Sequence, residues 1–363
     1  MKLISLECRV PDFAMSQRDM LAALQNSRAW DDLRDGSRQL LLKVLSGDSG
    51  IDKRHFACSE LNFLHRADGG VLCELFENFA PKLGTRALLA AVEAARLRPH
   101  ELDALLVCTC TGYLCPGLSS HIAEQAGLAP CAKLFDLAGQ GCGAAVPLLS
   151  LAESLTINGA ERVACVAVEL SSAAFYIDDD AGVLISLCLF ADGAAACVCT
   201  GDTDDSHFLA KLGGFRHLHS PGLRGELRFV NCGGKLRNIL RPGVPELVAE
   251  AVERIFPELL NTSGDFTLLA HPGGRKVLER LGEKFPLARL SHSQRVLRDF
   301  GNMSSPSVLF VLRDWLDTGT GSEAVAVAYG AGFSAHGFRV RKSDGSGGDR
   351  THDQLVKSQL LYH

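Results

Sequence analysis

The sequence predicts an α/β fold, because apolar segments typical of buried strands alternate with helical periodicity along most of the chain. A length of 363 residues with 47% hydrophobic residues suffices for one large domain or two fused halves. An internal echo favours two halves: Gly141-Cys142 and Gly301-Asn302 each precede a helical segment and then a strand. This plan suggests a duplication with a site at the junction of the halves.

Each expected element rests on its own local pattern. Strand-like runs are Leu102 to Cys108, Arg162 to Glu169, Ala194 to Thr200, Phe266 to Ala270 and Ala324 to Tyr329. Helical segments are Thr85 to Ala95, Ser120 to Ala126, Ala144 to Ile157, Val244 to Phe256, Arg275 to Leu281 and Val308 to Asp317. The two echoed helices carry Pro147 and Pro306 in their first turns, where proline is tolerated.

The echo sets the expected domain boundaries. We assign residues 1–205 to an N-terminal half with the cysteine and residues 206–341 to a C-terminal half with a histidine and an asparagine. Residues 342–363 begin with a Gly/Ser-rich linker-like stretch and then stay polar. We expect this tail to be disordered, since it has little to bury.

Composition excludes several function classes. A net charge of -5 gives no sign of nucleic-acid binding, and no apolar run reaches bilayer-spanning length. The first ten residues lack the apolar core of a signal peptide, and 13 cysteines without one fit a reducing cytoplasm. The pairs Cys108/Cys110 and Cys197/Cys199 lack metal-ligand spacing, so we interpret them as packing residues.

Cys142 lies in Gly-Gln-Gly-Cys-Gly-Ala-Ala, between a strand-like run and a helical one. Glycines allow a tight turn there, and the partial positive charge of a helix N-terminus favours a thiolate. A thiolate is the nucleophile of thioester chemistry. The alternative is an ordinary buried cysteine, as we expect for the other twelve.

Two further motifs supply partners for that cysteine. His271 ends an apolar strand before a Pro-Gly-Gly turn, and Asn302 occupies a turn before a helix. A histidine can hold a thiolate as an ion pair, and both side chains can donate hydrogen bonds to a developing oxyanion. Alone, each residue is equally compatible with a structural histidine and a helix cap.

Together these motifs resemble the type III polyketide synthases, the chalcone-synthase-like enzymes of the thiolase superfamily. The resemblance runs to about Val340 and rests on Gly139-Gln-Gly-Cys142-Gly-Ala, Leu189-Phe-Ala-Asp-Gly-Ala-Ala195, Ala270-His-Pro-Gly-Gly274 and Gly301-Asn-Met-Ser-Ser305. It implies a five-layered αβαβα thiolase-like fold, a cytoplasmic homodimer and a Cys142-His271-Asn302 triad. It also implies CoA thioesters as substrates, with no permanently bound cofactor, no metal, and neither nucleic acid nor membrane as partner.

The implied reaction is iterative. Cys142 would take a starter acyl group from an acyl-CoA, and His271 and Asn302 would stabilise the oxyanion. They would then assist decarboxylation of malonyl-CoA, whose enolate attacks the enzyme-bound thioester and extends the chain by two carbons. The chain would finally cyclise to a pyrone or resorcinol-type product.

The resemblance also implies substrate contacts. Phe190 and Phe229 match the gatekeepers between the CoA tunnel and the cavity. Cavity positions are Cys110, Thr111, Ala174 and Ser304, and Cys115 takes the place of a residue that reaches across the dimer. Small side chains at several of these positions, with Ala331 in the final loop, suggest a roomy cavity of bacterial type. A fatty acyl starter, giving an alkylpyrone or alkylresorcinol, is therefore one hypothesis.

Basic residues are expected at the tunnel mouth to meet the phosphates of CoA. The resemblance places Lys276, Lys53 and Arg54 there, while Asp52 stands where plant enzymes often have lysine. Each is equally compatible with a solvated surface charge.

Three other functions share some of these residues. A ketoacyl-synthase-III-like enzyme would take malonyl groups from a carrier protein, but the His-Pro-Gly-Gly and Asn-Met-Ser-Ser contexts argue against it. A degradative thiolase would bring a second catalytic cysteine near the C-terminus, yet none follows Cys232. A non-catalytic binding subunit would have no physical need for a complete triad.

Overall fold

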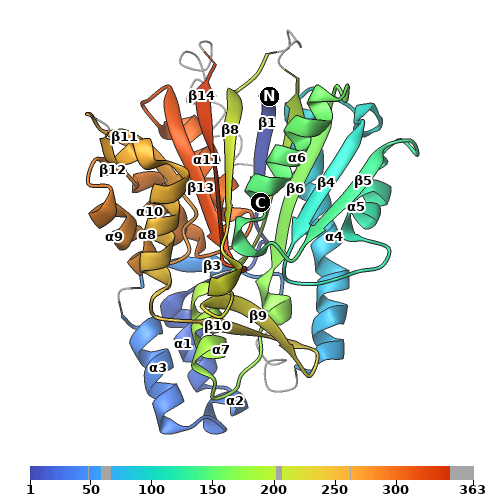
Figure 1. Ribbon diagram of the computed structural model, residues 1–363. Helices are drawn as coiled ribbons and strands as arrows, with labels where there is room; N and C mark the ends of the chain where they lie inside the picture. Colours follow the sequence, from blue (N-terminus) through green and yellow to red (C-terminus); the bar gives the residue numbers. More distant parts are fainter. Residues whose placement is uncertain (48, 59–66, 202–206, 262, 344–363) are drawn as a thin grey trace.

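The computed structural model describes residues 1–47, 49–58, 67–201, 207–261 and 263–343. Within them, ten strands form one sheet in the order β12-β11-β13-β14-β8-β1-β7-β6-β4-β5 (Figure 1). These are β1 (Lys2–Arg9), β4 (Ala104–Thr109), β5 (Lys133–Ala138), β6 (Val163–Leu170), β7 (Asp192–Thr200), β8 (Ala210–His219), β11 (Phe266–Ala270), β12 (Ala288–Arg289), β13 (Glu323–Gly330) and β14 (Ser334–Lys342).

The sheet consists of two halves with one pairing plan. In the first half, β5, β4 and β6 are parallel, and β7 and β1 continue antiparallel. In the second half, β12, β11 and β13 are parallel, and β14 and β8 continue antiparallel. A short antiparallel pairing of β1 with β8, at Lys2↔Lys211 and Leu3↔Ala210, joins them.

Helices complete five layers. Helices α6 (Ala145–Ile157) and α11 (Ser307–Thr318) contact strands of both halves and form the inner layer. One outer layer consists of α4 (Gly69–Ala94) and α5 (Leu118–Ala126), and the other of α8 (Val244–Ile255), α9 (Arg275–Lys284) and α10 (Ser291–Phe300). Separate apolar clusters fill the inner and the two outer interfaces, so the arrangement is αβαβα.

A smaller group of elements lies below the sheet in Figure 1. It contains the strand pair β2 (Ala14–Ser16) and β3 (Lys53–His55), the hairpin β9 (Leu227–Cys232) and β10 (Lys235–Leu240), and the helices α1 (Gln17–Gln25), α2 (Arg28–Asp31), α3 (Asp35–Leu45) and α7 (Ala181–Leu189). An apolar cluster of α1, α3 and α7 side chains holds these helices together.

The five predicted strands and six predicted helices are present, although the first helix begins far earlier, in α4, and runs through Pro81. We predicted that the tail begins at residue 342, but Lys342 still belongs to β14, where it pairs with Ala210. Residues 344–363, where we expected disorder, lie outside the described residues. No helix in the described part of the chain has the length and apolarity to cross a membrane.

Candidate active site

Cys142 sits in a single 3-10 turn, Gly141–Gly143, between β5 and α6. Gly141 has φ +62°, and a Cβ there would lie 2.6 Å from the Ala331 nitrogen. The loop after β13 therefore packs directly against the turn that contains Cys142, and both the close approach and the positive φ require glycine at position 141.

Hydrogen bonds connect Cys142 to the turn before α11. Ser304 Oγ donates to Cys142 Sγ at 3.2 Å, and Ser304 N donates to Asn302 Oδ1 at 2.8 Å. Asn302 Nδ2 in turn donates to the Gly273 carbonyl at 3.2 Å, in the loop after β11. The two echoed turns thus meet at the junction of the halves.

His271 reaches the same place from the end of β11. Its side chain is buried, and its ring meets the Tyr329 ring edge-on, with 5.1 Å between the centroids. Tyr329 Oη donates to the His271 carbonyl at 2.6 Å. The next residue, Gly330, lies so close that a Cβ would be 2.8 Å from Cys142 N. The structure therefore brings together the three segments that carry Cys142, His271 and Asn302.

Burial sets the protonation states. It raises the pKa of Cys142 to about 12, although the Ser304 hydrogen bond acts in the opposite direction, and the charge of Glu169 raises it further. Burial lowers the pKa of His271 to about 3. Both shifts disfavour the charged forms of Cys142 and His271, because burial removes water from each group.

Glu169 is a site residue that the sequence did not reveal. Its carboxylate, at the end of β6, is fully buried and accepts hydrogen bonds from Cys110 N at 2.9 Å, Thr111 Oγ1 at 2.9 Å and Ser305 Oγ at 2.5 Å. Cys110 Sγ lies 3.2 Å from both Glu169 Oε1 and Ser304 Oγ. Burial raises the pKa of this carboxyl. The sequence signal that could have identified Glu169 is a charged residue at the end of an otherwise apolar strand-like run.

The two predicted gatekeepers face each other over a small cavity. The ring centroids of Phe190 and Phe229 lie 6.1 Å apart. The cavity beneath them has about 30 Å³ of space and is also lined by Cys110, Thr111, Ser171, Ala174, Phe175, Ser186, Leu236 and Ser304. Of the predicted cavity residues, Cys110, Thr111, Ala174 and Ser304 line this space together with the two rings.

The predicted CoA contacts differ in placement. Lys53 and Lys276 are exposed, at β3 and in the first turn of α9. Arg54 is fully buried, so its assignment to the tunnel mouth is wrong. Successive side chains of a strand face opposite sides, and in β3 the lysine takes the solvent side. Cys115 is exposed on the loop after β4, away from the cavity of its own chain.

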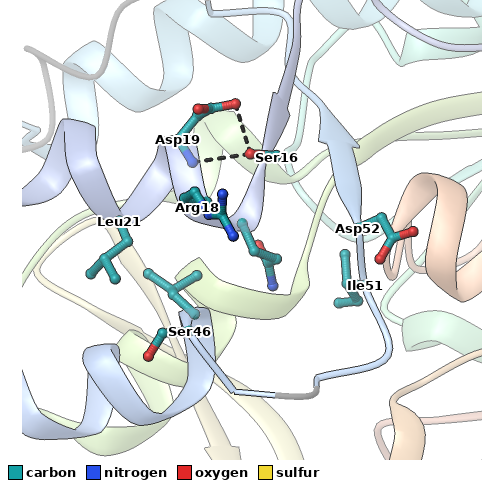
Figure 2. Close-up of a pocket in the computed structure, with 9 residues that line it drawn as sticks. Ser16, Arg18, Asp19, Leu21, Ser46, Ile51 and Asp52 are labelled. Atoms are coloured by element: carbon teal, nitrogen blue, oxygen red, sulfur yellow. Dashed lines mark hydrogen bonds between the residues drawn. The ribbon is translucent and has the colours of Figure 1, made fainter.

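A larger pocket of about 570 Å³ lies elsewhere, between the start of α1, the end of α3 and the residues before β3. Figure 2 shows Arg18, Asp19 and Asp52 around it, with Asp19 held by Ser16. Cys142, His271 and Asn302 do not line this pocket. No group of three or more potential metal ligands occurs in the described ranges.

Comparisons with known proteins show which family the chain resembles. The family model for FAE1/type III polyketide synthase-like proteins matches residues 17–212, and that for the C-terminal domain of chalcone and stilbene synthases matches residues 226–342. The 1,3,6,8-tetrahydroxynaphthalene synthase of Streptomyces peucetius is 30% identical over 85% of each chain. The phloroglucinol synthase of Pseudomonas fluorescens is 26% identical over 90% of this chain and 94% of the relative.

Solved structures share the fold. PKS-I from the brown alga Ectocarpus siliculosus superposes with a TM-score of 0.85 at 21% identity, covering 94% of this chain and 98% of that one. The C-terminal type III polyketide synthase domain of Steely1 from Dictyostelium gives a TM-score of 0.84 at 19% identity, covering 94% and 99%.

Proposed function

Because this chain is a member of the type III polyketide synthase family, we propose that Cys142 is its acyl-carrying nucleophile and that His271 and Asn302 are its catalytic partners. The chain is a condensing acyltransferase that builds polyketides from CoA thioesters. The observation that carries the residue assignment is the hydrogen-bonded path from Cys142 through Ser304 and Asn302 to the loop that begins with His271.

Loading begins with a proton transfer. The neutral imidazole of His271 accepts the Cys142 proton as the sulfur attacks the carbonyl of the starter thioester. The tetrahedral oxyanion receives hydrogen bonds from Asn302 Nδ2 and the newly formed imidazolium. When the oxyanion collapses, the CoA thiolate leaves and takes the proton, and the acyl group stays on Cys142.

Extension uses the same groups in a second role. Malonyl-CoA loses carbon dioxide, and Asn302 and His271 stabilise the resulting enolate oxygen, where charge appears only along the reaction. The enolate carbon attacks the acyl thioester, the Cys142 thiolate leaves, and it takes a proton from solvent. The product, a β-ketoacyl-CoA, can load again and ultimately cyclise.

For the starter, we infer a short acyl group, acetyl or malonyl, leading to a hydroxylated aromatic product. The cavity beneath Phe190 and Phe229 is small, about 30 Å³, and a short acyl group needs the least space. The two relatives are named for small hydroxylated aromatic products, which supports this choice over a fatty acyl starter.

We also infer a homodimer, with Lys53 and Lys276 meeting the phosphates of CoA. In the described residues, β5 pairs only with β4 and leaves one edge open at the end of the sheet. Leu134 on β5 is 40% exposed. An open apolar edge of this kind favours pairing with a second copy.

A product assay tests the function. Purified protein is given malonyl-CoA alone and with acyl-CoAs from acetyl to stearoyl plus aromatic ones, beside Cys142→Ala. We expect small aromatic polyketides, detected by mass spectrometry, that vanish in the variant. Better use of long acyl-CoAs would contradict the short starter, and activity only with carrier-protein substrates would contradict CoA dependence.

A further inference from the structure

Arg54 is the most deeply buried cation in the described residues: its side chain has no exposed surface. Nη1 donates to the carbonyls of Leu187 and Phe190, both at 2.7 Å, and Nε donates to Gln17 Oε1 at 3.0 Å. The guanidinium also lies over the Phe56 ring, 5.0 Å from its centroid. Burial lowers the pKa of Arg54 to about 10, so the cation persists at neutral pH.

These bonds satisfy the C-terminal end of α7. The last carbonyls of a helix have no partner within it and carry partial negative charge, so a cation is favourable there. Arg54 binds two of the carbonyls, Gln17 Nε2 binds Cys188 O at 2.9 Å, and Asn302 N binds Leu189 O at 3.0 Å. Three residues therefore bind the four consecutive carbonyls from Leu187 to Phe190.

The same side chain touches the catalytic turn. A Cβ at Gly301 would lie 2.7 Å from Arg54 Cγ, so the stem of the arginine occupies the space beside the residue before Asn302. Asn302 and Phe190 are also joined by a parallel bridge, in which Ala191 N donates to Asn302 O at 2.9 Å. The gate ring and the amide thus belong to one rigid unit that is built on Arg54.

We propose that Arg54 is a positioning residue, which fixes the Phe190 gate and the Asn302 amide in one shared geometry and so couples starter selection to condensation. This role rests on the proposed function of Cys142, His271 and Asn302. It differs from a purely structural role, because loss of the arginine changes what the site does and not only how stable the fold is.

The test compares Arg54→Lys and Gln17→Met with wild type. Lysine keeps the charge but cannot bond both carbonyls and Gln17 at once, because it lacks the planar fork of arginine. The control is Arg313→Lys on α11, whose arginine binds the Leu6 carbonyl and also the carboxylates of Glu7 and Asp317. The readouts are the alkylation rate of Cys142, kcat per alkylatable site, carbon dioxide released per carbon–carbon bond, and the relative use of short and medium acyl-CoA starters.

We expect Arg54→Lys to lower kcat about 10- to 100-fold, as misplacement of a catalytic group by about 1 Å does. Cys142 alkylation should stay within about twofold, while carbon dioxide release per bond and the use of longer starters rise. Gln17→Met should shift the same ratios less, and Arg313→Lys not at all. If Arg54→Lys fails to fold, the ratios measured for Gln17→Met decide whether the positioning role holds.

The positioning role would be overturned if the folded Arg54→Lys and Gln17→Met proteins kept the wild-type kcat, the wild-type carbon dioxide ratio and the wild-type starter profile. A wild-type protein that alkylates at Cys142 but never condenses would instead overturn the proposed function.

Discussion

At the level of single residues, burial raises the pKa of the Cys142 thiol and lowers the pKa of the His271 imidazole, and both directions favour a neutral pair in the proposed reaction. A preformed ion pair would give an alkylation rate that no longer depends on pH near neutrality. A buried thiol reacts only through its small thiolate fraction, and that fraction grows with pH until the pKa is reached.

We therefore predict that alkylation of Cys142 by iodoacetamide rises about tenfold per pH unit between about pH 6 and 9. Mass spectrometry of the peptide containing Cys142 separates it from the other twelve cysteines, and Cys142→Ala provides the blank. A plateau below pH 8 would show a thiolate already present in the free enzyme.

Ser304 is the group that counteracts burial at the nucleophile, since its hydroxyl donates to Cys142 Sγ. Ser304→Ala should raise the pKa of the thiol and slow its alkylation about fivefold at a fixed pH, the value of one hydrogen bond of about 1 kcal/mol. The control is Ser305→Ala, because that hydroxyl binds Glu169 and not the sulfur. Equal rates in the two variants would exclude this role for Ser304.

At the level of elements, β8 and β14 place a histidine pair beside the nucleophile turn. His217 and His336 are direct cross-strand partners, with 3.0 Å between their Nδ1 atoms. Burial lowers the pKa of His336 to about 4, and the nearby His217 and His219 act in the same direction. Only one of the two Nδ1 atoms can donate, so the contact requires a neutral partner.

This pair predicts an acid-sensitive fold. The folded-state pKa of His336, about 4, lies below the unfolded value of about 6.5. Between these pH values the unfolded chain binds one more proton than the folded chain. Stability therefore decreases as the pH falls through this range. From pH 7 to 5, His336→Gln should lose less unfolding free energy than wild type, by on the order of 1–2 kcal/mol. Urea denaturation at both pH values measures this, with exposed His100→Gln as the control. Equal losses in wild type and His336→Gln would contradict it.

The end of β13 also fixes the nucleophile turn. A Cβ at Gly330 would lie 2.8 Å from Cys142 N and 2.9 Å from Gly143 N, and neither backbone atom can yield easily. Gly330→Ala should therefore cut condensation at least tenfold, in line with the effect of small displacements on catalysis. Gly222→Ala, with nothing within 4 Å, is the control. Full activity of Gly330→Ala would mean that the two turns move independently.

The sequence predicts an element accurately where a polar or turn residue marks each of its two ends. Strand β11 matches residue for residue, because an apolar run lies between Asp265 and the His-Pro turn. Burial was harder to predict: Lys53 and Arg54 are adjacent cations, and only the pairing of β3 decides which one faces the interior. Glu169 escaped for a related reason, since its partners come from separate segments that only the fold brings together.

At the level of the whole molecule, the proposed homodimer would form along the open edge of β5. Leu134→Glu should place a charge on this edge and convert the dimer to monomer, because a buried unpaired carboxylate is costly. Sedimentation velocity at micromolar concentration measures the change. Ile157→Glu is the matched control, since Ile157 is 78% exposed at the far end of α6. A wild-type monomer would contradict the proposed dimer, and a Leu134→Glu dimer would place the interface elsewhere.

The junction between the halves has a consequence for synthesis on the ribosome. Cys142 and Ser304 are 162 residues apart, and the amide of Asn302 is likewise translated long after the nucleophile. A nascent chain that has emerged only as far as α6 carries the cysteine without an oxyanion partner. On the proposed mechanism such a chain lacks the groups that assist decarboxylation of malonyl-CoA, so we expect catalytic competence only after the second half has been translated.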